Sequence, residues 1–135
     1  MSGREDDLAA AAALAARGAA AAQRRRGPVV AVKLGPDGGL AVDGAASVRV
    51  PGPEVVAADT TGAGDSFDAG FLAGWLAGRS TADSLRLAVA CGALSLRAVG
   101  GTAGQASLDE AEALAATLAA AAADPGGDEP AGAER

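Results

Sequence analysis

The chain has 135 residues, which is enough for one domain with a modest core but not comfortably for two. Half of the residues are hydrophobic but only 2% are aromatic, so small side chains dominate the apolar share and the core needs close contacts between helices and sheet. The sequence has no His, one Cys and a net charge of −6, which excludes Ser-His-Asp catalysis, His-ligated zinc and an internal disulfide, and disfavours nucleic-acid binding.

The first half of the sequence predicts one helix followed by short strands. Residues 5–25 are rich in Ala, with acidic residues at the start and three arginines at the end, an order that complements the helix dipole. The arginines could also bind an anion, although a basic helix end is the simpler interpretation. The apolar run 29–34 predicts a strand buried on both faces of a parallel sheet. After a Gly-Pro turn, residues 40–43 and 47–50 predict a short meander, and 54–57 one more strand.

The second half of the sequence predicts three helices. The first spans residues 64–77, with aromatic residues at four-residue spacing on a core face and glycines on another face that would admit a close neighbour: Phe67, Phe71 and Trp75, then Gly70 and Gly74. The second spans 80–98. The third spans 107–122 and begins with a capping box formed by Ser107 and Glu110.

The residues with chemical potential concentrate in one segment, DTTGAGD, which spans 59–65. Gly62 and Gly64 allow consecutive backbone N–H groups to point into one concavity, and the helix that begins there adds partial positive charge. Asp65 lies in the first turn, where those N–H groups keep a carboxylate ionised. Such a pair suits phosphoryl transfer to an alcohol, because the carboxylate orients the hydroxyl proton and the amides stabilise the moving phosphoryl group. From the residues alone, a Gly-rich turn that merely caps a helix is the more common case.

Three further side chains each have two interpretations. Asp68 could share a metal or a proton with Asp65, but an exposed carboxylate is the simpler prediction. Cys91 could be a nucleophile, yet no basic residue is near it in sequence, which favours a small core residue. Lys33 stands inside an apolar strand, where either a bound phosphate or a structural ion pair would compensate its charge. The sequence does not separate these two interpretations of Lys33.

The string DTTGAGDSFDAGF, from Asp59 to Phe71, resembles the C-terminal signature of the ribokinase-like (PfkB) family of carbohydrate kinases. Residues 30–38 resemble the strand and nucleotide loop of that family, and 87–101 its following helix and glycine turn. The resemblance implies an α/β fold with three α/β/α layers and a mostly parallel sheet, of which this chain holds only the C-terminal portion. We therefore expect residues 1–123 to form the C-terminal part of a kinase domain. Independently of the resemblance, the Pro, Gly, Ala and acidic residues of 124–135 predict a disordered tail.

The resemblance also implies roles for individual residues. Asp65 corresponds to the catalytic base that deprotonates the sugar hydroxyl. The nucleotide loop of the family corresponds to Lys33, Gly35, Asp37 and Gly38. The anion hole corresponds to Gly62, Ala63 and Gly64. Val89 corresponds to a position near the adenine, where members often have Asn or His. Many members bind a monovalent cation, usually potassium, largely through carbonyl groups, and the corresponding positions are Asp59, Thr61, Ser95, Ala98, Gly100 and Gly104.

The function implied is an ATP-dependent phosphotransferase that acts on an alcohol group of a sugar or sugar-like substrate, with magnesium brought by ATP. The expected partners are ATP and that substrate, in a cytoplasmic protein without nucleic-acid or membrane contacts, either as a homodimer or lacking its N-terminal half. Family members are longer, and their sugar-binding residues and Asn-x-x-Glu motif precede the part present here. A truncated nucleotide-binding fragment without kinase activity, and a structural remnant that needs a partner chain, are the alternatives. A fragment, a mis-started reading frame and a degenerate copy remain open as explanations.

Overall fold

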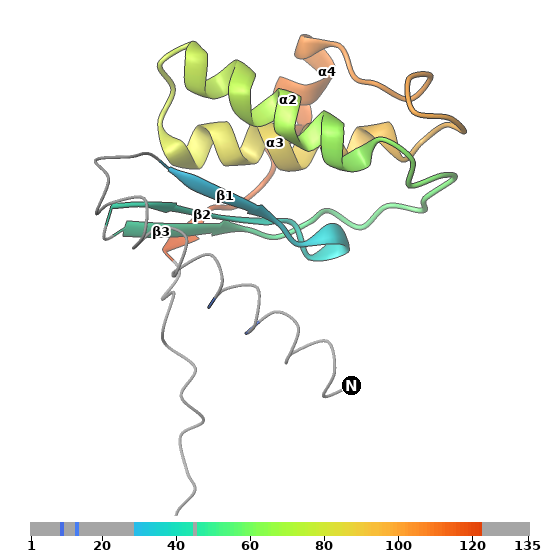
Figure 1. The fold of residues 1–135 in the computed structure, drawn as a ribbon. Helices are drawn as coiled ribbons and strands as arrows, with labels where there is room; N and C mark the ends of the chain where they lie inside the picture. The colour runs from blue at the N-terminus through green and yellow to red at the C-terminus, as the bar shows by residue number, and fades with distance from the viewer. Residues whose placement is uncertain (1–8, 10–12, 14–28, 45, 123–135) are drawn as a thin grey trace, which may run out of the picture.

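A computed structural model describes residues 9, 13, 29–44 and 46–122 of the chain. These residues form a sheet with a layer of helices over one face (Figure 1). The elements in chain order are β1 (Val30–Lys33), the short 3₁₀ helix η1 (Gly35–Asp37), β2 (Gly39–Asp43), β3 (Ala46–Val50), α2 (Ala63–Leu76), α3 (Thr81–Ser95), α4 (Leu108–Ala115) and β4 (Ala121–Ala122). The expected helix over 5–25, of which only residues 9 and 13 are described, and the expected tail over 124–135 lie outside the described residues.

The four described strands lie in the order β1-β2-β3-β4, and every neighbouring pair is antiparallel. Val30 is opposite Val42, Ala41 is opposite Val48, and β4 extends the sheet beyond β3. The α/β class and the meander are confirmed, but the expectation of a mostly parallel sheet is wrong for these strands. The reason is the length of the connections, since a few residues can join antiparallel neighbours whereas a parallel pair needs a crossover of a dozen or more.

The sheet buries its central strand most deeply. Ala41 packs with the helices, while Leu40 and Val42 point to the opposite face, as the alternation of side chains along a strand requires. Strand β1 was expected to be buried on both faces, but its residues 30–32 are only half-buried. Its one partner among the described strands is β2, so one edge of β1 is left without a neighbour there.

The helices α2 and α3 run antiparallel and pack against each other, with α3 the nearer of the two to the sheet (Figure 1). Two glycines of α2 make this close contact, as the sequence predicts. A Cβ atom at Gly70 would lie 2.8 Å from the carbonyl oxygen of Leu87, and one at Gly74 would lie 2.8 Å from the Cα of Ser84. The absence of side chains at these positions lets the backbones of the two helices meet directly.

The aromatic stripe of α2 is a core face only at its first residue. Phe67 is buried, Phe71 is half-buried, and Trp75 is 40% exposed and stacks on Phe71 with 6.3 Å between ring centroids. Each step of four residues turns about 40° further around a helix, because an α-helix has 3.6 residues per turn. The line of aromatic side chains therefore turns away from the core along α2, and the expectation that Trp75 belongs to a core face is wrong.

Two predicted elements differ from the structure. The residues 54–57 form no strand; they follow two prolines at 51 and 53 and run exposed along the molecule. The capping box at Ser107 and Glu110 is confirmed, but α4 ends at Ala115 instead of near 122. The chain then turns and adds β4 to the edge of β3, so pairing with the sheet overrides the helix propensity of the Ala-rich segment.

Candidate functional site

A cleft of about 640 Å³ opens where β1, the loop at 51–57, the start of α2 and the C-terminal half of α3 meet. In Figure 1 this is the end of the sheet at which η1 and the N-terminus of α2 lie. Six of the predicted nucleotide-binding residues line the cleft: Lys33, Gly35, Gly38, Ala63, Gly64 and Val89. The structure thus gathers residues that are up to 56 positions apart in sequence, the difference between 89 and 33.

The predicted residues Asp37, Gly62 and Asp65 do not line the cleft but are each the direct neighbour of a residue that does. Sequence reasoning missed a second set of lining residues, which form the apolar part of the wall: Val55, Ala57, Phe67, Gly92, Ala93 and Leu96. The residues of this set in the 54–57 segment were expected in a strand. The site was identified from the polar motif at 59–65, and that motif does not indicate which apolar residues lie beside it in the folded chain.

Two glycines shape the wall formed by η1. Gly38 has a φ of 91°, and a Cβ atom there would lie 2.0 Å from the carbonyl oxygen of Val50. A Cβ atom at Gly52 would lie 2.2 Å from the carbonyl oxygen of Pro36. Both the left-handed backbone and the close approach require glycine at Gly38, so the main chain of η1 packs directly on the chain that follows β3.

The N-terminus of α2 presents free backbone donors beside the cleft. Gly62 adopts a left-handed conformation with φ 78°, its carbonyl accepts a hydrogen bond from the N–H of Ser66, and the N–H of Ala63 donates to Thr60. The N–H groups of Gly64 and Asp65 have no acceptor within the part of the chain that the structure describes. Together with the helix dipole they attract an anion, and the exposed Asp65 carboxylate stands in the same first turn.

Lys33 ends β1 with its ammonium group at the start of α2. Its Nζ lies 3.0 Å from Oδ2 of Asp68 and 3.4 Å from the carbonyl oxygen of Gly64. The Lys33 side chain is 45% exposed, so the expectation of a buried lysine is wrong. Asp68 is exposed, as predicted, and it pairs with Lys33, so the structural ion pair is present at the mouth of a cleft that could also admit a phosphate.

Asp59 fixes the loop that precedes α2. Its Oδ1 accepts hydrogen bonds from the N–H and the hydroxyl of Thr61, at 2.9 and 2.8 Å, and its Oδ2 accepts one from the N–H of Gly100 at 2.8 Å. These hydrogen bonds lower the pKa of Asp59 to about 2, and the bond from Gly100 contributes most to the lowering. The carboxylate is therefore ionised and ties the loop before α2 to the turn after α3.

The six positions expected around a monovalent cation gather at this turn. Besides the bonds of Asp59, a Cβ atom at Gly104 would lie 2.4 Å from the carbonyl oxygen of Ser95 and 3.3 Å from the N of Ala98. Backbone carbonyl oxygens and carboxylates are the ligand types that suit a hard cation. Among the described residues, no group of three or more His, Cys, Asp or Glu side chains could hold a metal ion.

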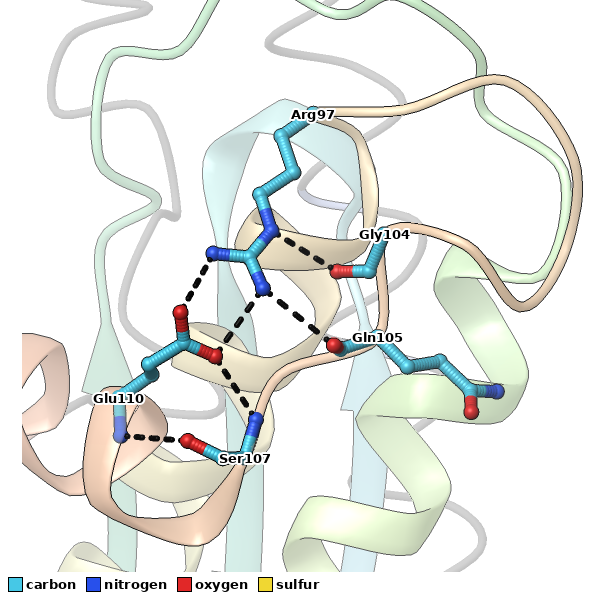
Figure 2. Close-up of polar contacts among 5 residues, drawn as sticks. All are labelled: Arg97, Gly104, Gln105, Ser107 and Glu110. Atoms are coloured by element: carbon cyan, nitrogen blue, oxygen red, sulfur yellow. Dashed lines mark hydrogen bonds and ion pairs between the residues drawn. The ribbon is translucent and has the colours of Figure 1, made fainter.

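A second polar cluster, formed by Arg97, Gly104, Gln105, Ser107 and Glu110, braces the segment between α3 and α4 (Figure 2). The guanidinium of Arg97 pairs with both carboxylate oxygens of Glu110, at 2.9 and 3.0 Å, and donates to the carbonyls of Gly104 and Gln105. Ser107 donates its N–H to Glu110. The bonds from Arg97, then that from Ser107, lower the pKa of Glu110 to about 2. The capping box predicted the contact with Ser107, but nothing in the sequence pointed to Arg97.

Two smaller expectations concern Cys91 and membranes. Cys91 is half-buried in α3, and burial raises the pKa of its thiol, which opposes the thiolate form that a nucleophile needs. No helix in the described part of the chain is both long and apolar enough to cross a membrane.

Comparison with known sequences gives matches over most of the chain. The family model described as pfkB family carbohydrate kinase matches residues 1–108. The ATP-dependent ribose-1-phosphate kinase of Halopiger xanaduensis is 44% identical over 90 residues, which are 67% of this chain and 29% of that protein. The fructoselysine 6-kinase of Escherichia coli is 44% identical over 68 residues, which are 50% of this chain and 26% of that protein.

Solved structures resemble the fold as well. The phosphofructokinase-2 of Escherichia coli in complex with potassium has a TM-score of 0.61 at 30% identity, and the match covers 71% of this chain and 32% of that one. The ribokinase of Thermotoga maritima has a TM-score of 0.60 at 31% identity, over 65% of this chain and 30% of that one. The chain spans about a third or less of the length of each of these proteins.

Proposed function

The chain belongs to the pfkB family of carbohydrate kinases, and from this premise we propose that it transfers the γ-phosphoryl group of ATP to a hydroxyl group of a sugar or sugar-like substrate. The relatives named above phosphorylate sugars or sugar derivatives according to their names. Because the chain spans less than a third of these two sequence relatives, the activity and the substrates of the whole protein are part of the proposal.

One observation carries the proposal: the start of α2 combines free amides, a carboxylate and a neighbouring ammonium group at the edge of one cleft. The N–H groups of Gly64 and Asp65 lack acceptors among the described residues, and the Nζ of Lys33 lies 3.4 Å from the carbonyl of Gly64. Positive charge and donors at one point favour phosphate groups.

In the proposed reaction, Asp65 accepts the proton of the acceptor hydroxyl. The hydroxyl oxygen forms a bond to the γ-phosphorus while the bond between that phosphorus and the bridging oxygen breaks, and ADP leaves with the electron pair. The free amides of Gly64 and Asp65 stabilise the charge on the moving phosphoryl group, and Lys33 binds the phosphates from the β1 side. Gly35, Asp37 and Gly38 hold the nucleotide loop, and Val89 contacts the base.

Two ions belong to this proposal. Magnesium would come with the nucleotide, whose phosphates supply the oxygen ligands that Mg²⁺ prefers. A monovalent cation such as potassium would be held by Asp59, Thr61, Ser95, Ala98, Gly100 and Gly104, and would neutralise charge next to the anion-binding turn. The potassium bound to the phosphofructokinase-2 of Escherichia coli supports this assignment.

The test is ATP-dependent phosphorylation across a panel of sugars, sugar phosphates and nucleosides. We expect Asp65→Asn to lower the turnover by about 10²-fold or more, because a general base contributes about 10²–10⁴-fold, and to leave nucleotide affinity within about threefold. The matched control is Asp109→Asn, which changes an exposed acid in the first turn of α4. Equal activity in the wild type and Asp65→Asn would contradict the assignment of the base.

The short span of the chain favours a second candidate, a nucleotide-binding fragment without turnover. Nucleotide binding measured by calorimetry, without phosphorylation of any acceptor, would support this candidate. A chain that neither binds ATP nor unfolds cooperatively would instead be a remnant that needs a partner chain or a preceding segment. A homodimer, tested by sedimentation, is a further part of the proposal.

A further inference from the structure

The ion pair between Lys33 and Asp68 joins two elements at the cleft. Lys33 is the last residue of β1 and lines the cleft, and Asp68 lies in the second turn of α2. The Nζ of Lys33 also lies 3.4 Å from the carbonyl oxygen of Gly64, besides 3.0 Å from Oδ2 of Asp68. Gly64 and Asp68 are four residues apart and therefore share one face of the helix. The two acceptors together hold the ammonium group against the start of α2.

The glycine at position 64 leaves room for the lysine side chain. A Cβ atom at Gly64 would lie 3.3 Å from the Nζ and 3.6 Å from the Cδ of Lys33. The lysine therefore lies along the same first turn of α2 in which the N–H groups of Gly64 and Asp65 lack acceptors among the described residues. An ammonium group has three donors, and two of them have acceptors in the described part of the chain. The third remains for a ligand in the cleft.

Stability alone gives little reason for this pair. The side chains of Lys33 and Asp68 are 45% and 56% exposed, and pairs with such exposure contribute little to folding. A lysine that is already held in place, however, loses less conformational freedom when an anion binds to it. In protein kinases, a lysine on a strand must likewise pair with a carboxylate on a helix while it contacts the phosphates of ATP.

We propose that Asp68 is a positioning residue, which holds the ammonium group of Lys33 where a triphosphate meets that group and the free amides together. The inference rests on the proposed function, which supplies the triphosphate. Asp68 acts through Lys33 and takes no proton. The opposite effect is repulsion between its carboxylate and the phosphates, and this effect alone would make binding tighter when the charge is removed. The direction of the change in affinity therefore separates the two effects.

The first experiment is calorimetry on the full 135-residue chain, with magnesium and a non-hydrolysable analogue of ATP, and separately with inorganic triphosphate. We expect Asp68→Asn to raise the Kd of both ligands by about fivefold, and Asp68→Glu to stay within about twofold of the wild type. The matched control is Glu112→Gln, which removes one negative charge from an ion pair with Arg79 outside the cleft and should change neither Kd by more than about twofold.

Unchanged or tighter binding by Asp68→Asn would overturn the inference and leave the kinase proposal standing. An equal loss of affinity in Asp68→Asn and Glu112→Gln would overturn it as well, since net charge would then explain both. If the wild type binds no nucleotide, the proposed function fails, and the inference fails with it. Thermal unfolding monitored by circular dichroism checks that the variants fold.

The second experiment asks whether Asp68 acts through Lys33. Lys33→Met keeps the length of the side chain and removes its charge. In that background we expect Asp68→Asn to change the Kd of the ATP analogue by less than about twofold, because residues that act together are not additive. A fivefold loss in both backgrounds would show that Asp68 acts independently of the lysine, which would overturn its assignment as a positioning residue.

Discussion

Two carboxylates brace the turn between α3 and α4, and they do so with different partners. Each carboxylate together with its hydrogen-bond partners is called a corner of this turn, the Asp59 corner and the Glu110 corner. Asp59 accepts hydrogen bonds from two backbone N–H groups and one hydroxyl, all of them neutral. Glu110 accepts two hydrogen bonds from the guanidinium of Arg97 and one from the N–H of Ser107 (Figure 2). Both groups have a pKa of about 2, so both are ionised at neutral pH.

The difference concerns net charge. Around Glu110 the charges of arginine and carboxylate cancel, which suits a purely structural brace. Around Asp59 neutral donors stabilise the carboxylate without cancelling its charge, and this corner adjoins the anion-binding start of α2. Uncompensated charge is typical of functional sites, because it remains available to a ligand. We therefore expect changes at Asp59 to alter function and changes at Glu110 to alter stability.

The largest expected effect is that of Asp59→Asn on phosphoryl transfer. The amide of Asn cannot accept from both Thr61 and Gly100, since one of its two polar groups is a donor. The loop before α2 would shift, and a misplacement of about 1 Å in a catalytic group can cost about 10²-fold in rate. Steady-state kinetics would measure this loss. Glu110→Gln is the control and should keep the wild-type turnover; an equal loss in both variants would remove the distinction between the two corners.

A smaller effect is expected at Gly104, which packs against the end of α3 and belongs to the cluster around Arg97. A Cβ atom at Gly104 would lie 2.4 Å from the carbonyl oxygen of Ser95, and Gly104 itself accepts a hydrogen bond from Arg97. Gly104→Ala should lower the free energy of unfolding by about 1–3 kcal/mol, the usual cost of overpacking. Urea denaturation measures this change.

The matched control for that glycine is Gly101→Ala. A Cβ atom at Gly101 meets only a methyl group of Thr61, at 3.6 Å, which is an ordinary contact. This variant should remain within about 0.5 kcal/mol of the wild type, as surface substitutions usually do. A Gly104→Ala variant as stable as Gly101→Ala would show that the turn relaxes without cost.

The sequence predicted the two corners unequally. The motif around Asp59 was identified because it contains Gly and Asp residues in a short, specific string, and the structure brings the positions that follow α3 to it. The capping box at Glu110 was predictable from local spacing. Its bond to Arg97 was not, because the two residues are 13 positions apart and only the fold of the intervening turn brings them together.

The same limit applies to the fold. Local patterns predicted β1, the meander, α2 and α3 to within a few residues, since hydrophobic periodicity and turn residues act locally. The antiparallel order of the whole sheet, the early end of α4 and the pairing of β4 depend on contacts between distant segments. The apolar part of the cleft wall was missed for the same reason, because Val55 and Ala93 become neighbours of one cavity only in the folded chain.

Acid provides a test in which both corners respond, at different pH values. Each carboxylate has a folded pKa of about 2, below the ordinary values of 3.8 for Asp59 and 4.5 for Glu110. A depressed folded pKa contributes stability above the unfolded pKa, and that stability is lost as the pH falls through the folded pKa. The contribution of Glu110 should therefore decline from about pH 4.5 and that of Asp59 from about pH 3.8, both down to about pH 2.

The measurement is the melting temperature between pH 7 and pH 2. Glu110→Gln should flatten the upper part of the decline and Asp59→Asn the lower part. Asp109→Asn, which changes an exposed acid of the same helix as Glu110, should leave the profile almost unchanged. A wild-type profile that neither variant alters would contradict the roles of both carboxylates.

The smallest expected effect is a difference in how strongly salt changes the stabilising contribution of each corner. The pair of Arg97 and Glu110 is more than two-fifths exposed on both sides, so dissolved ions screen its attraction, and the Debye length falls from about 10 Å at 0.1 M to about 3 Å at 1 M. The hydrogen bonds of Asp59 come from neutral donors and depend less on screening. Raising sodium chloride from 0.1 to 1 M should therefore reduce the loss of stability caused by Glu110→Gln more than that caused by Asp59→Asn. If salt instead reduced both losses equally, the carboxylate of Asp59 would be held by long-range charge, and the contrast between a neutralised corner and a charged one would not stand.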